Sequence, residues 1–217
     1  MPVPGSDGHA GDERHYDGLL VDWGGVLTSN LFDSFGSFCE LEGLERDAVA
    51  RRFREDRASR ELVIELETGR LAEEEFEARF APILGVAPPG LIDRLFARSR
   101  PDALMLGAVR RARDAGVRTG LISNSWSARH YDRALLAELF DGVVISGEVG
   151  IRKPAPEIYA LAVQRIGVSA AACVFVDDLP VNLEPAAQLG MATVHHVRSL
   201  DTVPALERIL GVELRPS

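Results

Sequence analysis

The sequence has little cysteine and no long apolar run. Cys39 and Cys173 are the only cysteines among 217 residues, and two distant thiols do not make a disulfide framework, so we expect a protein of the reducing cytoplasm. No apolar run reaches membrane-spanning length and the N-terminus lacks the apolar core of a secretion signal, so no membrane association is expected. Residues 1–15, rich in Gly, Pro, Asp and His, are predicted to form a flexible tail.

Positively charged residues are fewer than negatively charged ones, and lysine is almost absent. The sequence holds 24 Lys and Arg residues against 33 Asp and Glu, a formal net charge of -9. Such a chain repels a nucleic-acid backbone, so we expect no nucleic-acid partner, although a local anion site is compatible with this charge. Lys153 is the only lysine. Because an ammonium is a compact point charge and a guanidinium a planar fork, either this position requires an ammonium or lysine stands there by chance in an arginine-rich composition.

What the sequence does contain is a regular alternation of strand and helix signals. Short apolar runs, typical of buried strands, occupy five segments: Gly18–Asp22, Val117–Ser123, Gly142–Ser146, Cys173–Asp177 and Ala192–Val197. Helical patterns lie between the later strands, at Ala128–Leu139, Ala155–Ile166 and Val181–Leu189. This alternation predicts an α/β fold with a doubly wound, parallel, Rossmann-like sheet of about five strands.

The first two predicted strands are separated by a gap far longer than the roughly dozen residues that a simple crossover needs. Helical signals fill the gap; for example, apolar residues recur at helical spacing between Phe76 and Leu84. We therefore predict that residues 31–100 form a small helical subdomain, inserted into a core made of residues 16–30 and 101–217.

Polar residues that can carry chemistry follow the predicted strands, at the edge where open parallel sheets bind ligands. They are Asp22 after the first strand, Ser123 and Asn124 at the second, Lys153 in the loop after the third, and Asp177 and Asp178 at the fourth. Each of them alone is equally compatible with a turn or a helix cap. Four strand ends that deliver such residues to one edge favour a single site.

This set of side chains suits phosphoryl transfer. A carboxylate that attacks a phosphate dianion meets repulsion, which a divalent cation and an ammonium can offset. Mg²⁺ prefers hard oxygen ligands such as carboxylates. Ser123 can donate a hydrogen bond to a phosphoryl oxygen, and Gly24 and Gly25 let the backbone approach a ligand closely. We therefore expect magnesium and a small phosphorylated metabolite at this edge.

In their order, these residues resemble the haloacid dehalogenase superfamily of hydrolases over nearly all of the chain after the tail. The stretches that carry the resemblance are Val21-Asp22-Trp23-Gly24-Gly25-Val26-Leu27, Leu121-Ile122-Ser123-Asn124, Lys153-Pro154 followed by Tyr159, and Val176-Asp177-Asp178 followed by Asn182. Each stretch is short and unspecific, but the ordered set is highly specific. The helical insertion is similar to the cap of that superfamily.

The resemblance implies a nucleophile and a metal site. Asp22 would form an aspartyl-phosphate, and Asp22, the Gly24 carbonyl and Asp178 would hold magnesium. Asp177 would act beside them by orienting a water molecule.

The resemblance also implies how the substrate is held. Ser123, Asn124 and Gly25 would bind the phosphoryl group, and Lys153 would neutralise charge on the nucleophile and the phosphate. The cap would exclude water, select the substrate and open for product release.

One position departs from the family pattern. Phosphatases of the superfamily usually carry a second Asp two residues after the nucleophile, which protonates the leaving group and then activates water. Here that position is Gly24. Because loss of a general acid–base group typically costs about 10²–10⁴-fold in rate, we expect an activity that is weak or that takes its proton donor from the cap, water or substrate.

Two other functions stay open. A 2-haloacid dehalogenase also lacks the second Asp and needs no metal, but the pair Asp177-Asp178 argues against it. A non-catalytic domain that binds a phosphorylated ligand or a protein partner is compatible with Gly24. A phosphonoacetaldehyde hydrolase is set aside, because it requires a cap lysine and the predicted cap has none.

Overall fold

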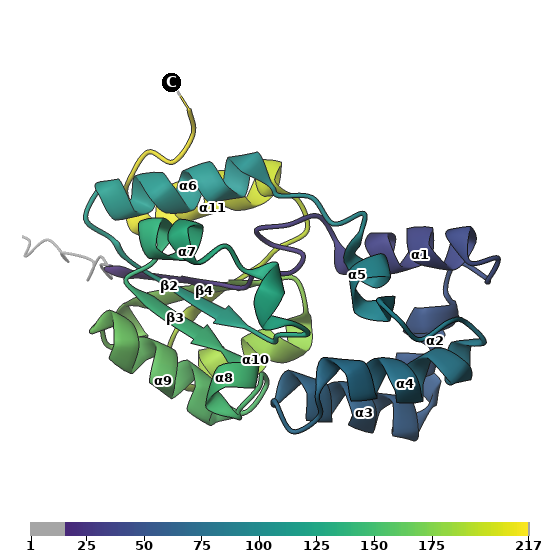
Figure 1. Ribbon diagram of the computed structural model, residues 1–217. Coiled ribbons are helices and arrows are strands. Elements are labelled where there is room, and N and C mark those ends of the chain that lie inside the picture. Colours follow the sequence, from purple (N-terminus) through teal and green to yellow (C-terminus); the bar gives the residue numbers. More distant parts are fainter. Residues whose placement is uncertain (1–15, 217) are drawn as a thin grey trace, which may run out of the picture.

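A fully parallel, five-stranded sheet lies between two layers of helices (Figure 1). The computed structural model describes residues 16–216, so the predicted tail lies outside the described residues. The strands are β1 (Gly18–Val21), β2 (Arg118–Ser123), β3 (Gly142–Ile145), β4 (Cys173–Asp177) and β5 (Ala192–His195), in the order β3-β2-β1-β4-β5. The predicted α/β fold class is confirmed, and each strand lies within about two residues of its predicted bounds.

Helices cover both faces of this sheet (Figure 1). One face carries α6 (Ala103–Asp114), α7 (Arg133–Leu139) and α11 (Ser199–Leu210), and the other carries α8 (Ser146–Val149), α9 (Pro156–Ile166) and α10 (Pro180–Gln188). Because successive strand residues point to opposite faces, Leu19 and Val21 of β1 pack into the first layer and Leu20 into the second. β1 is buried along its whole length, which explains its continuous apolar sequence.

One predicted helix is wrong in its extent. Instead of a single helix over residues 128–139, the chain forms a 3-10 turn at Ala128–His130 and then α7. The break is at Asp132, whose carboxylate accepts hydrogen bonds from the backbone N–H groups of Ala134 and Leu135 and so begins a new helix. No prediction covered α11.

The long connection between β1 and β2 is helical throughout, with α1 (Leu31–Leu41), α2 (Ala48–Glu55), α3 (Arg57–Glu67), α4 (Glu73–Leu84) and α5 (Leu91–Phe96). We call α1–α5 the helical region. It has a hydrophobic cluster of its own, with Phe38, Phe76, Phe80 and Leu95 at its centre. Figure 1 shows the helical region beyond the carboxyl ends of the strands, where the candidate site residues are expected.

The two segments that join the helical region to the sheet run side by side. Thr28 and Pro101 form an antiparallel bridge, the Ser29 N–H donates to the Arg100 carbonyl at 2.7 Å, and the Asp102 N–H donates to the Leu27 carbonyl at 2.9 Å. Any movement of the helical region relative to the sheet therefore acts on both segments together.

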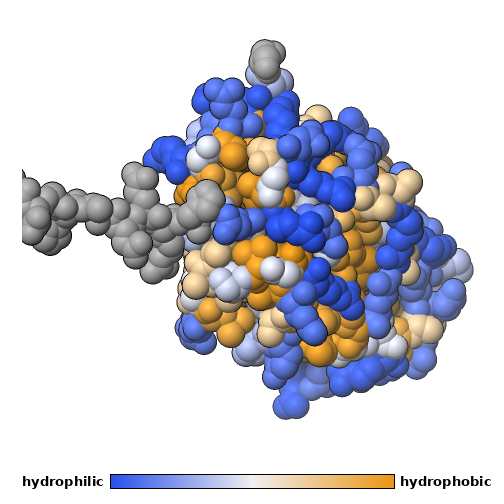
Figure 2. All heavy atoms as spheres, turned by 90° about the vertical axis from the view of Figure 1, so that its left-hand side faces the viewer, coloured by the Kyte–Doolittle hydropathy of each residue, from blue (hydrophilic) through white to orange (hydrophobic). Residues whose placement is uncertain are grey.

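The end of the molecule remote from the helical region presents hydrophobic patches among hydrophilic side chains (Figure 2). The described residues include no helix that is both long and apolar enough to cross a membrane.

Candidate active site

The register of the sheet brings the predicted residues to one edge. Val21, the last residue of β1, pairs with Leu121 of β2 and Val176 of β4, and the Asp22 N–H donates to the Val176 carbonyl at 2.9 Å. Asp22 therefore lies level with Asp177, and all strands run in the same direction.

Lys153 lies between two of these carboxylates. Its side chain is 1% exposed, and its Nζ lies 2.8 Å from Asp22 Oδ1 and 2.7 Å from Asp177 Oδ2. A fully buried ammonium is costly unless it is paired, and here it has two anionic partners. The structure thus shows why an ammonium suits the single lysine position: two oxygens from different strands converge on one compact charge.

The charges in this corner perturb one another's protonation. Burial raises the pKa of Asp22 to about 8, with repulsion from Asp177 and Asp178 acting in the same direction and the Lys153 ammonium opposing it. Burial and the neighbouring Asp177 raise the pKa of Asp178 to about 6. Burial disfavours the charged form of Lys153, but attraction to Asp177 and Asp22 outweighs it and raises the pKa of Lys153 above its ordinary value.

Asp177 is fixed from three directions. Besides Lys153 it accepts hydrogen bonds at Oδ1 from the Leu179 N–H at 2.8 Å and from the Asn182 side-chain amide at 2.9 Å. Asn182 is buried in the first part of α10, and its carbonyl accepts from the Tyr159 hydroxyl. Asp177 is therefore fully engaged and fully buried, whereas Asp178 is only partly buried.

Asn124 and Ser123 lie at the same edge, with their own partners. The Asn124 side chain exchanges two hydrogen bonds with the backbone of Lys153: Nδ2 donates to its carbonyl at 3.1 Å, and Oδ1 accepts from its N–H at 2.9 Å. Asn124 therefore holds the lysine loop against β2. The Ser123 hydroxyl is 2.8 Å from the Tyr131 hydroxyl. Their predicted contacts with a phosphoryl group stay predictions.

The two glycines after Asp22 are matched to neighbouring side chains. Gly25 has a φ of +74°, and a Cβ there would lie 2.2 Å from Asp178 Oδ2, so a side chain would collide with a candidate metal ligand. A Cβ at Gly24 would lie 2.7 Å from Leu31 Cδ1. A side chain at the place of the family's second Asp therefore requires the end of the Leu31 side chain to shift.

A divalent cation fits the acidic corner. Asp22, Asp177 and Asp178 each offer an oxygen atom, and these atoms lie within 4.8 Å of one another. Three carboxylates face one ammonium, so two negative charges stay uncompensated if all four groups are charged. Hard oxygen donors with excess negative charge are the chemistry that Mg²⁺ requires. The Gly24 carbonyl as a further ligand stays a prediction.

A cavity of about 370 Å³ opens from this corner towards the helical region, with Asp22, Lys153 and Asp178 at one end. The helical region contributes its opposite wall, chiefly apolar residues of α1, α2 and α3: Leu31, Phe32, Phe35, Phe53, Val63 and Ile64. Trp126 also lines the cavity and packs against aromatic rings of the helical region.

Glu67, at the end of α3, was not predicted as a site residue, yet it joins the helical region to the loops that follow β2 and β3. It is buried, accepts a hydrogen bond from Trp126 Nε1 at 3.0 Å and pairs with Arg152 Nε at 2.6 Å. Trp126 is two residues beyond Asn124, and Arg152 immediately precedes Lys153. Burial raises the pKa of Glu67, and Arg152 opposes this. Nothing in its surroundings in the sequence separates Glu67 from the other charged residues of α3.

Comparison with curated proteins gives two informative relatives. Bifunctional epoxide hydrolase 2 of Sus scrofa is 35% identical over 132 residues, which cover 57% of this chain and 24% of that protein. A sesquiterpene phosphatase of Aspergillus oryzae is 34% identical over 119 residues, which cover 52% of this chain and 59% of that protein. The chain thus spans less than two thirds of the length of either relative.

Solved structures share the fold at low identity. A HAD-like family hydrolase from Porphyromonas gingivalis superposes with a TM-score of 0.69 at 22% identity, over 91% of this chain and 99% of that chain. A HAD family enzyme from Bacteroides thetaiotaomicron, in complex with magnesium and inorganic phosphate, gives 0.61 at 21%, over 84% and 94%. An L-2-haloacid dehalogenase from Xanthobacter autotrophicus gives 0.61 at 20%, over 91% and 84%.

A family model settles the assignment that these likenesses suggest. The model of haloacid dehalogenase-like hydrolases matches residues 16–190, which include every candidate residue of the acidic corner. Since this match spans most of the chain, the protein belongs to the haloacid dehalogenase-like hydrolases.

Proposed function

We propose that this hydrolase removes the phosphoryl group from a small phosphate monoester, with Asp22 as the nucleophile and magnesium as the cofactor. The observation that carries the proposal is the buried Lys153 ammonium, 2.8 Å from Asp22 Oδ1 and 2.7 Å from Asp177 Oδ2, next to the partly exposed Asp178. A haloacid substrate has one negative charge and no phosphoryl group, so it does not call for an acidic corner that can hold a divalent cation.

In the proposed first step, Asp22 Oδ2 forms a bond to phosphorus while the ester P–O bond breaks. Among residues 16–216, the contacts of the Asp22 side chain fall on Oδ1, which accepts from Lys153 Nζ and from the Trp23 N–H at 2.7 Å. Oδ2 is therefore the oxygen left for attack. In the second step, water attacks phosphorus, the bond to Asp22 breaks, and inorganic phosphate leaves.

Lys153 and the acidic residues make the first step electrostatically feasible. Lys153 neutralises part of the charge that accumulates as the carboxylate meets the phosphate. Asp22, Asp178 and the Gly24 carbonyl would hold Mg²⁺, which supplies when bound the further positive charge that the reaction needs. Asp177 and Asn124 keep Lys153 in place through its side chain and its backbone.

The missing second Asp determines which esters react. With Gly24 in its place and Leu31 Cδ1 filling the adjacent space, no carboxylic acid at that position protonates the leaving group. The leaving oxygen must take its proton from another donor or leave as an anion, so we expect the first step to be faster for aryl phosphates than for alkyl phosphates by about 10²-fold or more.

The test is release of p-nitrophenol from p-nitrophenyl phosphate, with and without Mg²⁺, by the wild type and by Asp22→Asn. We expect Mg²⁺-dependent turnover in the wild type and none above background in Asp22→Asn, because the amide is not a nucleophile of the required kind. Equal turnover by both proteins would reject the proposal. If neither protein turns over the ester, 2-haloacids without metal are the next substrates, and their hydrolysis would assign the dehalogenase function instead.

A further inference from the structure

The cavity at the acidic corner has two chemically different ends. Asp22, Lys153 and Asp178 occupy one end, and the wall opposite them consists chiefly of aliphatic and aromatic side chains from α1, α2 and α3. At about 370 Å³ the cavity is at the small end of the range of ligand pockets. A ligand that places a phosphoryl group at the acidic end must therefore lay the rest of its body against the apolar wall.

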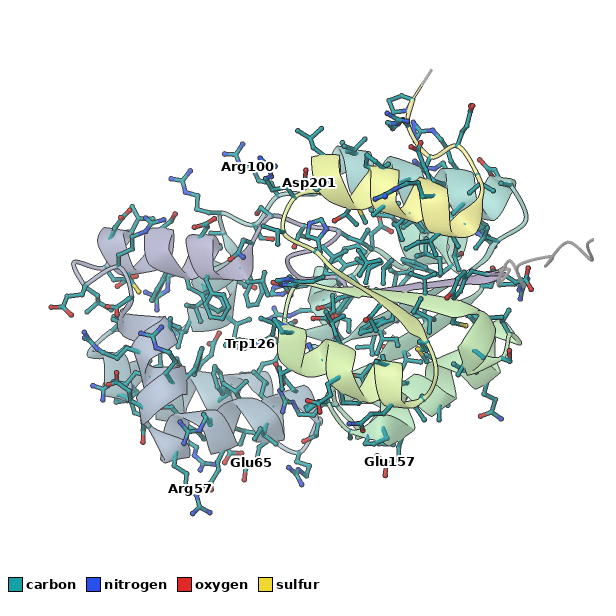
Figure 3. The ribbon with its side chains drawn as sticks, turned by 180° about the vertical axis from the view of Figure 1, so that it is seen from behind. Arg57, Glu65, Arg100, Trp126, Glu157 and Asp201 are labelled. Carbon is teal, nitrogen blue, oxygen red and sulfur yellow. The ribbon has the colours of Figure 1, made fainter. Side chains whose placement is uncertain are left out.

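Aromatic rings pack against one another in this wall. Trp126 lies 5.5 Å from the Phe35 ring and 5.7 Å from the Phe53 ring, centroid to centroid, and the Trp126 N–H is satisfied by Glu67. Figure 3 shows Trp126 between the helical region and the sheet. The ring thus presents an apolar surface whose single polar group points to a partner within the protein.

The two arginines that line the cavity each have a contact within the protein. Arg60 donates to the backbone carbonyls of Phe53 and Arg54, and Arg152 pairs with Glu67. A sugar or an amino acid needs several donors and acceptors placed along the cavity, and the wall on the helical region is chiefly apolar. A hydrocarbon chain needs none of them.

Exposed apolar side chains continue this wall to the mouth of the cavity. Phe32 of the helical region is 46% exposed, and Leu179 and Val181 on the sheet side are 39% and 60% exposed; all three line the cavity. Leu179 directly follows the candidate metal ligand Asp178. Apolar surface on both sides of a catalytic opening is the arrangement that an apolar ligand would cover.

We propose that the physiological substrate is a phosphate monoester that carries a hydrocarbon chain, with this chain along Phe32, Phe35 and Phe53 and its end at the mouth beside Leu179 and Val181. This rests on the proposed function for the phosphoryl end only. The chain end rests on the apolar wall, and its binding can be measured without any turnover.

The first experiment measures the binding of n-alkylphosphonates from ethyl to decyl, whose C–P bond is not hydrolysed, by calorimetry in Mg²⁺ buffer below their aggregation limits. We expect Kd to fall by about fourfold per methylene while the chain enters the cavity, as burial of a methylene predicts, and to level off once the chain reaches the mouth. Glucose 6-phosphate should bind at least tenfold more weakly than hexylphosphonate. A Kd that does not depend on chain length, or tighter binding of glucose 6-phosphate, would overturn the proposal.

A matched pair of variants locates the chain. Phe32→Gln and Leu41→Gln both replace an exposed apolar residue of α1, 46% and 72% exposed, but only Phe32 lines the cavity. Phe32→Gln should weaken decylphosphonate binding by about fivefold to tenfold and leave ethylphosphonate binding within twofold. Leu41→Gln should change neither. Equal effects of the two variants would overturn the placement of the chain.

The two proposals fail in different ways. Chain-length-dependent binding without hydrolysis of p-nitrophenyl phosphate would support the apolar ligand and reject the phosphatase. Hydrolysis of p-nitrophenyl phosphate with no chain-length dependence would support the phosphatase and reject the apolar ligand.

Discussion

At the sheet edge, the cavity presents charges that are buried and paired, with Lys153 between Asp22 and Asp177. Across the same cavity, the helical region presents mainly aliphatic and aromatic side chains. The chemistry at the sheet edge depends on a few charged atoms placed within tenths of an ångström. Binding at the wall of the helical region depends on the summed contacts of many apolar atoms. Substitutions at the sheet edge should therefore lower turnover of every substrate, whereas substitutions on the helical wall should change which substrates bind.

The largest effect is expected at the buried ammonium. Lys153→Met should lower kcat for p-nitrophenyl phosphate by about 10²–10³-fold, because it removes a fixed positive charge next to the nucleophile. KM should change much less. Lys153→Arg keeps the positive charge, but the planar guanidinium does not fit a site where the lysine side chain is 1% exposed. We therefore expect its kcat to stay close to that of Lys153→Met. Full activity of either variant would show that the ammonium is dispensable.

The next largest effect is expected at Glu67, whose contacts join the helical region to the sheet side. Glu67→Ala leaves Trp126 Nε1 without its acceptor and Arg152 without its partner, and breaking such a buried pair typically costs about 3–5 kcal/mol. We expect a clearly lower free energy of unfolding in urea denaturation.

Glu65→Ala is the control for Glu67→Ala, since Glu65 is on the same helix but 42% exposed and 3.7 Å from Arg79 (Figure 3). An exposed pair of this kind contributes about 0–1 kcal/mol. If Glu67→Ala lowers the free energy of unfolding no more than Glu65→Ala does, the Glu67 contacts between the helical region and the sheet contribute little to stability.

A smaller effect, an increase in rate, is expected from placing an aspartic acid at position 24. Gly24→Asp alone meets Leu31 Cδ1, so we combine it with Leu31→Ala. In single-turnover measurements, the double variant should raise the rate of the first step, transfer of the phosphoryl group to Asp22, by about tenfold or more for an alkyl phosphate, as general acid catalysis predicts. That step should change little for p-nitrophenyl phosphate, whose leaving group needs no proton. Equal changes for both esters would argue against a missing acid at position 24.

Metal binding should depend on pH in a defined direction. The pKa of Asp22 is raised to about 8 and that of Asp178 to about 6, so both carboxyls lose protons between pH 6 and 8. A cation competes with these protons, so Mg²⁺ affinity should rise with pH in this window, by about tenfold. Calorimetry at pH 6, 7 and 8 tests this, and an affinity that falls with rising pH would contradict it.

The contrast between the charged sheet edge and the apolar wall also explains which parts of the structure could be predicted from the sequence. The strands were predictable because apolar runs stop at polar residues, and parallel strands bring those residues to one edge. The apolar wall was not predictable, because Phe35 and Phe53 lie in amphipathic helices and cannot be told from core residues by sequence. Glu67 lies in a helix rich in charged residues, which favours a solvated face, and only the tertiary structure brings it to Trp126 and Arg152.

Other features depend on contacts that no local pattern encodes. The Asn124 side chain binds the backbone of a loop 29 residues away, and Leu31 fills the space beside Gly24 from across the cavity. The break before α7 is different, because Asp132 is a local capping signal that was present in the sequence. The cytoplasmic location and the absence of a nucleic-acid partner stay predictions.

The most direct test of the central claim, an aspartyl-phosphate on Asp22, is the pre-steady-state release of p-nitrophenol. Formation of the intermediate needs no acid with this leaving group, but its hydrolysis lacks the base that position 24 would supply, and such a loss typically slows a step by about 10²–10⁴-fold. The intermediate should accumulate, giving a burst of about one p-nitrophenol per protein molecule before slow turnover, absent in Asp22→Asn. Linear release from the first turnover in the wild type, or a burst that persists in Asp22→Asn, would contradict the account.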